Sequence, residues 1–438
     1  MKIKLIYPKQ VSINSFEESG ASYFEMRRGI WYPLLTFPVL AAYTPPGVED
    51  IRIIDEEFEA IDFDDPVDLV GITVMTFLAH RAYEIAGRFR ERGVKVVLGG
   101  MHVSALPEEA IQHADAIVIG EGEEVWPNLI QDFLKNELKP VYKAPHLFDT
   151  QKYRPARLDL LEKYSKADPS SQQKGYTSIA IFEVSRGCPY DCDFCAVTQF
   201  YGKNYRFRDI DRLIQDVRNF KLKFKTRLIG FVDDNLYGNK TYFKELLQKV
   251  SKLNVFWSGQ ISVNVAQNPD IVKMMADSGC RGMFVGFESL SQESLNSVNK
   301  KINRVDQYHR LMELFAKHNI MLFPSIMFGL DGDGPGIFEE TMKFLNTYSS
   351  IIAYASFAIL TPLPGTRLFQ RMKAENRILH YDWRYYNFNN VLIKPALMSP
   401  EELQNGFEWI IRNFDYKKIF SRIIGMMGTT PGQISSIS

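Results

Sequence analysis

Three of the four cysteines lie within eight residues, in the segment SRGCPYDCDFCAVTQ. Cys188, Cys192 and Cys195 have the spacing C-x3-C-x2-C. A structural zinc site needs four ligands, usually from two C-x2-C pairs, and the chain has no second pair and no suitably spaced histidine pair. A cubane iron–sulfur cluster held by three thiolates keeps one iron open for a substrate or cofactor. The spacing therefore favours a [4Fe–4S] cluster with one open iron.

The bulk composition limits the class of protein. A chain of 438 residues is long enough for two or three domains. Its 52 basic and 52 acidic side chains balance, so charge gives no indication of a nucleic-acid partner. Clustered cysteines in so long a chain indicate a reducing, cytoplasmic compartment rather than a disulfide framework, and the lone Cys280 is expected to be an inert buried thiol. Because Pro33 and Pro38 interrupt the most apolar region, Ile30–Tyr43, we expect a buried helix there and no transmembrane segment.

Short β-branched runs alternate with helical patterns over residues 1–140. This alternation predicts a doubly wound, Rossmann-like parallel sheet, in which ligands bind at the carboxyl ends of the strands. No G-x-G-x-x-G motif follows a strand, so a dinucleotide is not favoured. The expected strands are Lys2–Tyr7, Ile51–Asp55, Asp68–Val74, Val94–Leu98 and Ala116–Ile119.

The polar residues 141–176 are expected to be a linker, followed by a second alternating series over residues 177–365. Six strands in that series predict a partial (β/α)6 barrel, similar to a TIM barrel, with its chemistry at the carboxyl ends of the strands. Residues 366–438 are expected to be a small helical region whose amphipathic pattern favours packing on the barrel over a lid above an apolar substrate. The whole chain is thus predicted to be α/β. The expected barrel strands are Ile179–Val184, Leu228–Asp233, Val255–Ile261, Gly282–Phe287, Met321–Phe328 and Ala353–Leu360.

The cysteine spacing, with the aromatic Phe194 before the last cysteine, resembles that of the radical S-adenosylmethionine (SAM) enzymes. The resemblance implies that SAM binds the open iron through its amino and carboxylate groups. An electron from the cluster, supplied by an external donor such as flavodoxin or ferredoxin, would cleave SAM to a 5′-deoxyadenosyl radical. Residues at the ends of the later barrel strands are the implied SAM contacts, and a strand-end cap or a core position is the alternative role of each. With Phe194, these candidates are Asp233, Asp234, Ser262, Asn264, Glu288 and Ile326.

Ahead of the barrel, the segments VGITVMTF, VVLGGMHVSALPEEA and DAIVIGEGE resemble the cobalamin-binding domain of the B12-dependent radical SAM enzymes. Members of that family methylate hopanoids, bacteriochlorophylls, peptides and other unactivated carbons, or close a porphyrin ring. The D-x-H-x-x-G motif that gives some cobalamin proteins a cobalt ligand is absent, so His102 is either an unusual cobalt ligand or a hydrogen-bonded turn residue. The implied cobalamin-binding residues are Thr73, Thr76, Gly99, Gly100, His102, Gly120 and Glu121.

This resemblance implies a methyltransferase. The radical would remove hydrogen from an unactivated substrate carbon, which would then receive a methyl group from methylcobalamin. Ring closure or carbon–carbon coupling with the same cofactors, and a non-catalytic cobalamin and iron–sulfur sensor, stay open as alternatives. The substrate is equally open among small molecules, lipids, tetrapyrroles, and peptides or proteins. Of the cations after the cysteines, Arg206, which lies between aromatic residues, is the favoured candidate to hold a substrate carboxylate or phosphate.

Overall fold

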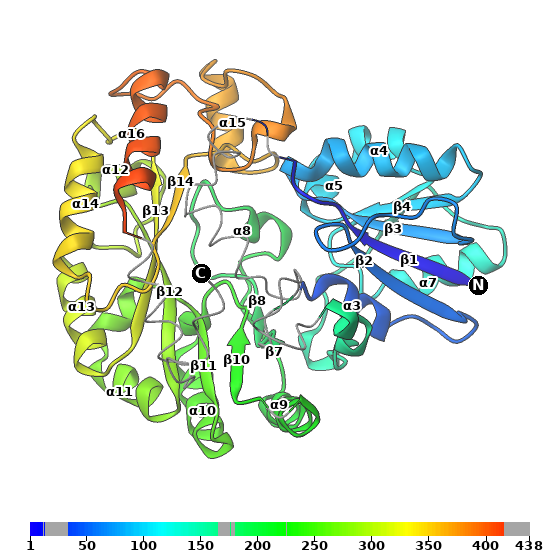
Figure 1. The fold of residues 1–438 in the computed structure, drawn as a ribbon, viewed down its shortest axis with the longest axis horizontal. Coiled ribbons are helices and arrows are strands. Elements are labelled where there is room, and N and C mark those ends of the chain that lie inside the picture. Colours follow the sequence, from blue (N-terminus) through cyan, green and yellow to red (C-terminus); the bar gives the residue numbers. More distant parts are fainter. Residues whose placement is uncertain (12, 14–33, 165–175, 177–179, 225, 416–438) are drawn as a thin grey trace, which may run out of the picture.

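The computed structural model contains two six-stranded sheets that lie side by side (Figure 1). The first sheet, on the right in that view, is formed near the N-terminus, and the second is formed by the middle of the chain. The structure describes residues 1–11, 13, 34–164, 176, 180–224 and 226–415. Within these residues, no helix is long and apolar enough to cross a membrane.

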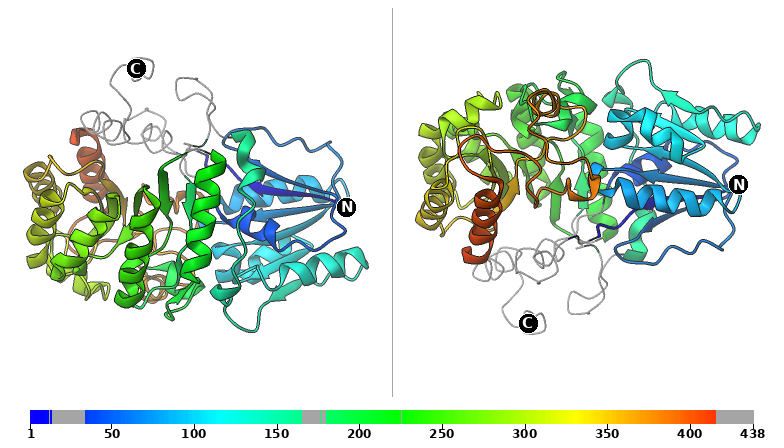
Figure 2. Two further views of the ribbon diagram at one scale, coloured as in Figure 1. Left: turned by 90° about the horizontal axis from the view of Figure 1, so that it is seen from below. Right: turned by 90° about the horizontal axis from the view of Figure 1, so that it is seen from above.

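The first sheet is parallel throughout, with the strand order β2-β1-β3-β4-β5-β6. Its strands are β1 (Lys2–Tyr7), β2 (Asp50–Asp55), β3 (Leu69–Thr73), β4 (Lys95–Gly99), β5 (Ala116–Ile119) and β6 (Val141–Lys143). Its helices are α3 (Thr36–Ala42), α4 (Ala79–Arg90), α5 (Met101–Ala105), α6 (Pro107–Ala110) and α7 (Trp126–Leu134). Successive residues of β1 face opposite sides, so Leu5 packs in a core with α7 and Ile6 packs in a core with α4. Helices therefore cover both faces (Figure 2), which confirms the doubly wound fold.

Strand β6 lies inside the range predicted to be a linker. It pairs in parallel with β5, and Leu161, Tyr164 and Tyr176 pack into the core on the α7 face. The alternation of apolar and polar residues did not reveal β6 because a strand of three residues is too short to carry a pattern. The described part of residues 141–176 thus packs on the first sheet, while the predicted domain limits stay predictions.

The helix predicted over Ile30–Tyr43 is present as α3, which buries Phe37, Val39 and Ala41. Pro38 is tolerated because it lies in the first turn, where its missing N–H would have no helical partner. Residues 30–33 of the predicted helix lie outside the described residues.

The second sheet is also parallel, with the order β14-β13-β12-β11-β10-β7. Because β7 and β14 are at opposite edges, the sheet is an open half-barrel, which confirms the predicted partial barrel. Its strands are β7 (Ala180–Phe182), β10 (Leu228–Phe231), β11 (Phe256–Ile261), β12 (Cys280–Glu288), β13 (Met321–Phe328) and β14 (Ser356–Ile359). Its helices are α9 (Ile210–Phe224), α10 (Lys240–Val250), α11 (Pro269–Asp277), α12 (Gln292–Ser297), α13 (Tyr308–Lys317) and α14 (Ile337–Thr347).

A small antiparallel pair was not predicted from the sequence. Its strands are β8 (Ser185–Arg186) and β9 (Arg206–Phe207), which flank the cysteine segment and the short helix α8 (Ala196–Phe200). Two-residue strands are too short to have a detectable period. The pair closes the chain into a loop that carries all three clustered cysteines.

In the described residues, two α-helices follow the barrel, α15 (Arg367–Ala374) and α16 (Pro400–Asn413). A capping box formed by Ser399 and Glu402 begins α16, which buries Leu403, Phe407 and Ile410 in the barrel core. The prediction that this amphipathic segment packs on the barrel is confirmed for its described part. The later residues of the predicted tail, 416–438, lie outside the described residues.

Candidate active site

The three clustered cysteines lie on one loop that follows β7 and β8 at the carboxyl end of the barrel. All three are free thiols; Cys192 is buried, and Cys188 and Cys195 are partly exposed. The loop begins with a sharp turn at Gly187, which has φ 84°. A Cβ atom there would lie 2.6 Å from the carbonyl oxygen of Asn204, so only glycine fits this close approach.

Contacts from the C-terminal region hold this loop in shape. Arg367, at the start of α15, donates from Nη1 to Asp191 (2.6 Å) and from Nε to Asp193 (2.9 Å). The Leu368 amide donates to the Asp193 carbonyl (2.9 Å), and the Asn299 side chain donates to the Asp191 carbonyl (2.6 Å). The two aspartates lie between the cysteines in sequence, so these contacts fix the spacing of the thiols.

A partly buried cation, Lys300, lies beside the thiols. Its Nζ is 2.9 Å from Glu288 Oε1 and 5.6 Å from the centre of the Phe194 ring. Burial lowers the pKa of Lys300, but Glu288 and the thiols of Cys192 and Cys195 raise it more, so the net pKa is raised and the side chain is an ammonium. Lys300 was not predicted as a site residue, because it belongs to no motif and does not directly follow a predicted strand.

Burial disfavours the thiolate form of each cysteine, and Lys300 favours it. The pKa of Cys188 and of Cys192 is raised by burial, and that of Cys195 is raised to about 12. In each case the charge of Lys300 acts in the opposite direction. Iron binding at these thiols must therefore release protons, with Lys300 offsetting part of the charge that remains.

The donor set fits a three-cysteine cluster. Among the described residues, no three His, Cys, Asp or Glu side chains converge on a point that could hold a single metal ion. A cubane cluster does not need such convergence because each cysteine binds a different iron. The Nδ2 atom of Asn235 is buried without a hydrogen-bond partner in the described part of the chain, and its amide lies close enough to Cys188 to lower the pKa of that thiol. A buried amide donor beside Cys188 suits a site that holds cluster sulfur, because hydrogen bonds to sulfur stabilise such clusters.

The two aspartates after β10 have different surroundings. Asp233 is buried and accepts hydrogen bonds from the Val184 and Ser185 amides and the Ser185 hydroxyl, so it caps the start of the cysteine loop. Asp234 is partly buried, and burial together with the charge of Glu183 raises its pKa to about 7, against the opposing effect of Arg186. Its charge also raises the pKa of Cys188 and Cys195, which indicates that it lies near these thiols.

The other SAM candidates differ in their surroundings. Ser262 Oγ donates to Asn264 Oδ1 (2.6 Å), and Asn264 Nδ2 donates to the Tyr190 hydroxyl in the cysteine loop (3.0 Å). Glu288 ends β12 at a bulge and has φ 65°, an uncommon conformation for a non-glycine residue. Ile326 instead packs in the barrel core, which corresponds to its alternative role.

Neutral residues end two neighbouring strands of the first sheet, Thr73 in β3 and Gly99 in β4. Gly100 has φ 107°, and a Cβ atom there would lie 2.8 Å from the Val74 carbonyl oxygen, so the chain itself packs closely at this residue. The Gly120 amide donates to Ser104 Oγ (2.9 Å). A Cβ atom at Gly120 would meet no described atom within 4 Å, so the backbone is open to close approach there.

His102 is fully buried and hydrogen-bonded rather than pointed at an open site. Its Nε2 lies 3.2 Å from Glu109 Oε1 and its Nδ1 lies 3.4 Å from the Thr76 hydroxyl. Glu109 also accepts from Trp383 Nε1 (3.1 Å) and from the Tyr83 hydroxyl (2.9 Å). Burial lowers the pKa of His102, against the effect of Glu109. This geometry favours the hydrogen-bonded alternative over cobalt ligation.

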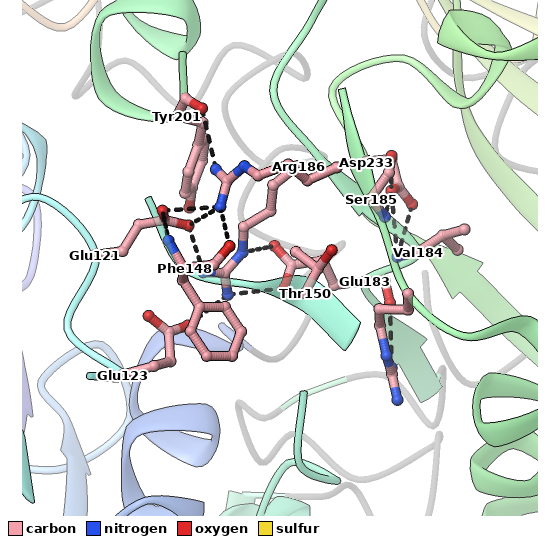
Figure 3. Close-up of polar contacts among 12 residues, drawn as sticks. Glu121, Glu123, Phe148, Thr150, Glu183, Val184, Ser185, Arg186, Tyr201 and Asp233 are labelled. Atoms are coloured by element: carbon pink, nitrogen blue, oxygen red, sulfur yellow. Dashed lines mark hydrogen bonds and ion pairs between the residues drawn. The ribbon is translucent and has the colours of Figure 1, made fainter. Parts of the chain in front are cut away.

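Glu121 and Arg206 meet in a largely buried network that joins the two domains, which we call the ion-pair junction: Glu121, Glu123, Glu183, Arg186 and Arg206. Figure 3 labels Glu121, Glu123, Glu183 and Arg186 of this junction. Arg186 binds Glu121 (2.8 Å), Glu123 (2.5 Å) and Glu183 (2.8 Å). Arg206 binds Glu121 (2.9 Å) and the Phe148 carbonyl (2.5 Å). The predicted roles in substrate and cobalamin binding are not supported by this placement, because both side chains already have internal partners.

A cavity of about 210 Å³ lies between the two domains, and none of the described residues that line it is charged. It is smaller than the roughly 300–1,000 Å³ of usual ligand sites. The cavity lies between the carboxyl end of the first sheet and helix α8, which directly follows Cys195. Its lining residues are Met75, Thr76, Phe77, Met101, Ser104, Ala105, Ala196, Gln199, Phe200, Leu363, Pro364, Gly365 and Phe388.

Two family models match the chain in the order of its sheets, the B12 binding domain over residues 42–130 and the Radical SAM superfamily over residues 182–345. Bacteriochlorophyllide d C-12(1)-methyltransferase from Chlorobaculum tepidum is 34% identical over 78% of this chain and 73% of that protein. Bacteriochlorophyllide d C-8(2)-methyltransferase from the same organism is 34% identical over 83% of this chain and 81% of that protein. The chain belongs to the cobalamin-dependent radical SAM methyltransferases.

This radical SAM methyltransferase shares its fold with a solved member, TsrM from Kitasatospora setae, with cobalamin and a [4Fe–4S] cluster bound. The TM-score is 0.66 at 15% identity, over 94% of this chain and 88% of that one. The family membership confirms the predicted methyltransferase function and its three cofactors, a [4Fe–4S] cluster, SAM and cobalamin. The roles of individual site residues in the methyltransferase stay predictions.

Proposed function

We propose that this methyltransferase adds a methyl group to an unactivated carbon at the edge of a chlorin-type tetrapyrrole. The interdomain cavity carries the proposal, since its lining comes from the carboxyl ends of both sheets and is uncharged. An apolar, flat ring system fits such a lining, whereas a charged peptide side chain would lose its hydration without gaining a partner. The two bacteriochlorophyllide methyltransferases at 34% identity support the same substrate class.

The barrel edge supplies the charged groups of the proposed site. When bound, the cluster, SAM and cobalamin supply the radical and methyl-transfer chemistry, and the chain positions them. The three cysteines would hold the cluster. Asp234, with its pKa at about 7, suits the amino group of SAM because a nearby cation favours its carboxylate form. Lys300 suits the SAM carboxylate, and Glu288 fixes the position of Lys300.

The neutral edge would receive the corrin. Backbone at Gly120 has open space and could approach a ring and its amide side chains closely, while Gly99 and Gly100 let the chain pack tightly beside it. Thr73 and Thr76 offer hydroxyl groups. The His102 ring would hold the Thr76 hydroxyl in position through its Nδ1 contact and would not be a cobalt ligand. The cluster also needs a reductant, and we propose a flavodoxin or ferredoxin as the donor.

Methyl-labelled SAM tests this function. Protein reconstituted with iron, sulfide and cobalamin in the absence of oxygen is given a chlorin substrate, labelled SAM and a reductant. We expect label in the chlorin product, with 5′-deoxyadenosine and S-adenosylhomocysteine in equal amounts. Ring closure would give 5′-deoxyadenosine and an unlabelled product, and that result would replace methyl transfer by the cyclase alternative. Labelled product from an isoprenoid hydrocarbon but not from the chlorin would contradict the proposed substrate class.

A further inference from the structure

Phe388 has an unusual backbone conformation in the segment that follows α15. Its φ is 70°, in the left-handed region. Asparagine and glycine adopt this region readily, whereas a bulky aromatic residue there is a genuine outlier. Among the described residues, the other six non-glycine residues with positive φ are five asparagines and Glu288, which lies at the proposed SAM site. An aromatic ring at position 388 is thus kept at a conformational cost.

The surroundings of Phe388 impose this conformation. Its carbonyl oxygen accepts a hydrogen bond from the amide of Ile359, the last residue of β14 (2.7 Å). On either side, the buried Asn387 side chain accepts from the Asn389 amide (3.1 Å) and from Asn390 Nδ2 (2.7 Å). Gln404 of α16 donates to the Asn389 carbonyl (3.3 Å). The neighbours are therefore buried and fixed, and the barrel edge sets the direction of the Phe388 side chain.

Core packing does not account for the ring. In the described part of the chain, Phe388 belongs to none of the five apolar cores and is only partly buried, between asparagines that are buried. It lines the interdomain cavity instead, together with Met101 of the first domain and Phe200 of α8. Strained residues that are held by their surroundings cluster at ligand sites. The ring lies between the carboxyl end of the first sheet, which is the proposed cobalamin site, and helix α8, which follows the cysteines. In the proposed function, the substrate carbon must lie between these two sites.

We infer that Phe388 is a specificity-determining residue that packs against the flat face of the substrate ring. The inference rests on the proposed function, because it takes the chlorin as the ligand. Aromatic side chains stack well on planar ring systems and add apolar area without charge. The C-terminal region thereby contributes a substrate contact in addition to the Arg367 contacts that hold the cluster loop.

Replacement of Phe388 by residues that accept positive φ separates substrate binding from folding. We compare wild type with Phe388→Asn and Phe388→Gly, reconstituted with cluster and cobalamin. The matched control is Asn376→Gly, at an exposed position with φ 54°. Binding of a fluorescent zinc chlorin, the thermal unfolding midpoint, the cobalamin absorption spectrum and labelled product are measured for each protein.

We expect Phe388→Asn and Phe388→Gly to bind the zinc chlorin roughly 10–200-fold more weakly, the range for lost apolar contacts in a pocket. Their unfolding midpoints should equal or exceed that of wild type, because the backbone strain is relieved, and their cobalamin spectra should be unchanged. The Asn376→Gly control should match wild type in chlorin binding and product. Unchanged chlorin binding in the Phe388 variants, whatever their stability, overturns the inference and leaves the proposed function intact. If neither wild type nor the variants bind or methylate the chlorin, the proposed function falls and the inference falls with it.

Discussion

At the carboxyl end of the barrel sheet the side chains next to the cysteines are charged, whereas in the first sheet the carboxyl ends of β3 and β4 carry neutral residues. Asp234, Glu288 and Lys300 represent the charged edge. Gly100 and the buried His102 represent the neutral edge. Buried charges persist only where they have partners, so the charged edge is suited to ionic groups such as thiolates and the zwitterionic end of SAM. The neutral edge is suited to a large uncharged ring that backbone can approach.

Loss of a cysteine should disable the charged edge and spare the neutral one. Cys192→Ala removes one of the three proposed cluster ligands, so we expect no 5′-deoxyadenosine, while the cobalamin absorption spectrum of the reconstituted protein stays as in wild type. The matched control is Cys280→Ala, since Cys280 is a buried free thiol at the start of β12. Continued 5′-deoxyadenosine formation by Cys192→Ala would remove the cluster from this loop, and loss of cobalamin would show that the two edges depend on each other.

Breaking the ion-pair junction should affect both edges at once. Arg186→Met removes the cation that binds the buried Glu123 and one of the two cations that bind Glu121. We expect a loss of about 3–5 kcal/mol in the free energy of unfolding, measured by denaturant titration. Arg157→Met is the control, because Arg157 forms an exposed pair with Asp159 that should contribute less than about 1 kcal/mol. Similar losses in the two variants would mean that the junction does not hold the domains together.

The smallest expected effect is a change in protein stability when His102, at the neutral edge, is replaced. Burial lowers the pKa of His102 below its ordinary value of 6.5, so the unfolded chain binds more protons than the folded protein as the pH falls below 6.5. The stability from neutral His102 is therefore complete above pH 6.5 and is lost as the pH falls towards the folded-state pKa. His102→Gln should lose about 1 kcal/mol at pH 7.5 and show a shallower fall in unfolding midpoint between pH 7.5 and 5.5. A changed cobalamin spectrum in this variant would instead support cobalt ligation.

The features that could be predicted from the sequence are those that depend on a local pattern of residues. The spacing of the cysteines, five strands of the first sheet and all six barrel strands follow from motif and period. Lys300, the ion-pair junction and Phe388 could not be predicted, because their roles arise from contacts between distant segments. Arg206 illustrates the limit: its charge is visible in the sequence, but its partner Glu121 lies 85 residues earlier. Asp233 and Asp234 are adjacent in sequence, yet only tertiary structure distinguishes a loop cap from a free carboxylate.

The contact between Arg367 and the cluster loop has a consequence for how the enzyme is made. Arg367 lies 174 residues after Asp193, so the ribosome must synthesise most of the barrel after the cysteines have emerged. At about 5–20 residues per second this interval is roughly 10–30 s. During that time the thiols are present on a nascent chain whose loop lacks its outer support. We therefore expect iron and sulfur to be inserted after translation, once the C-terminal region has docked on the loop that carries the cysteines.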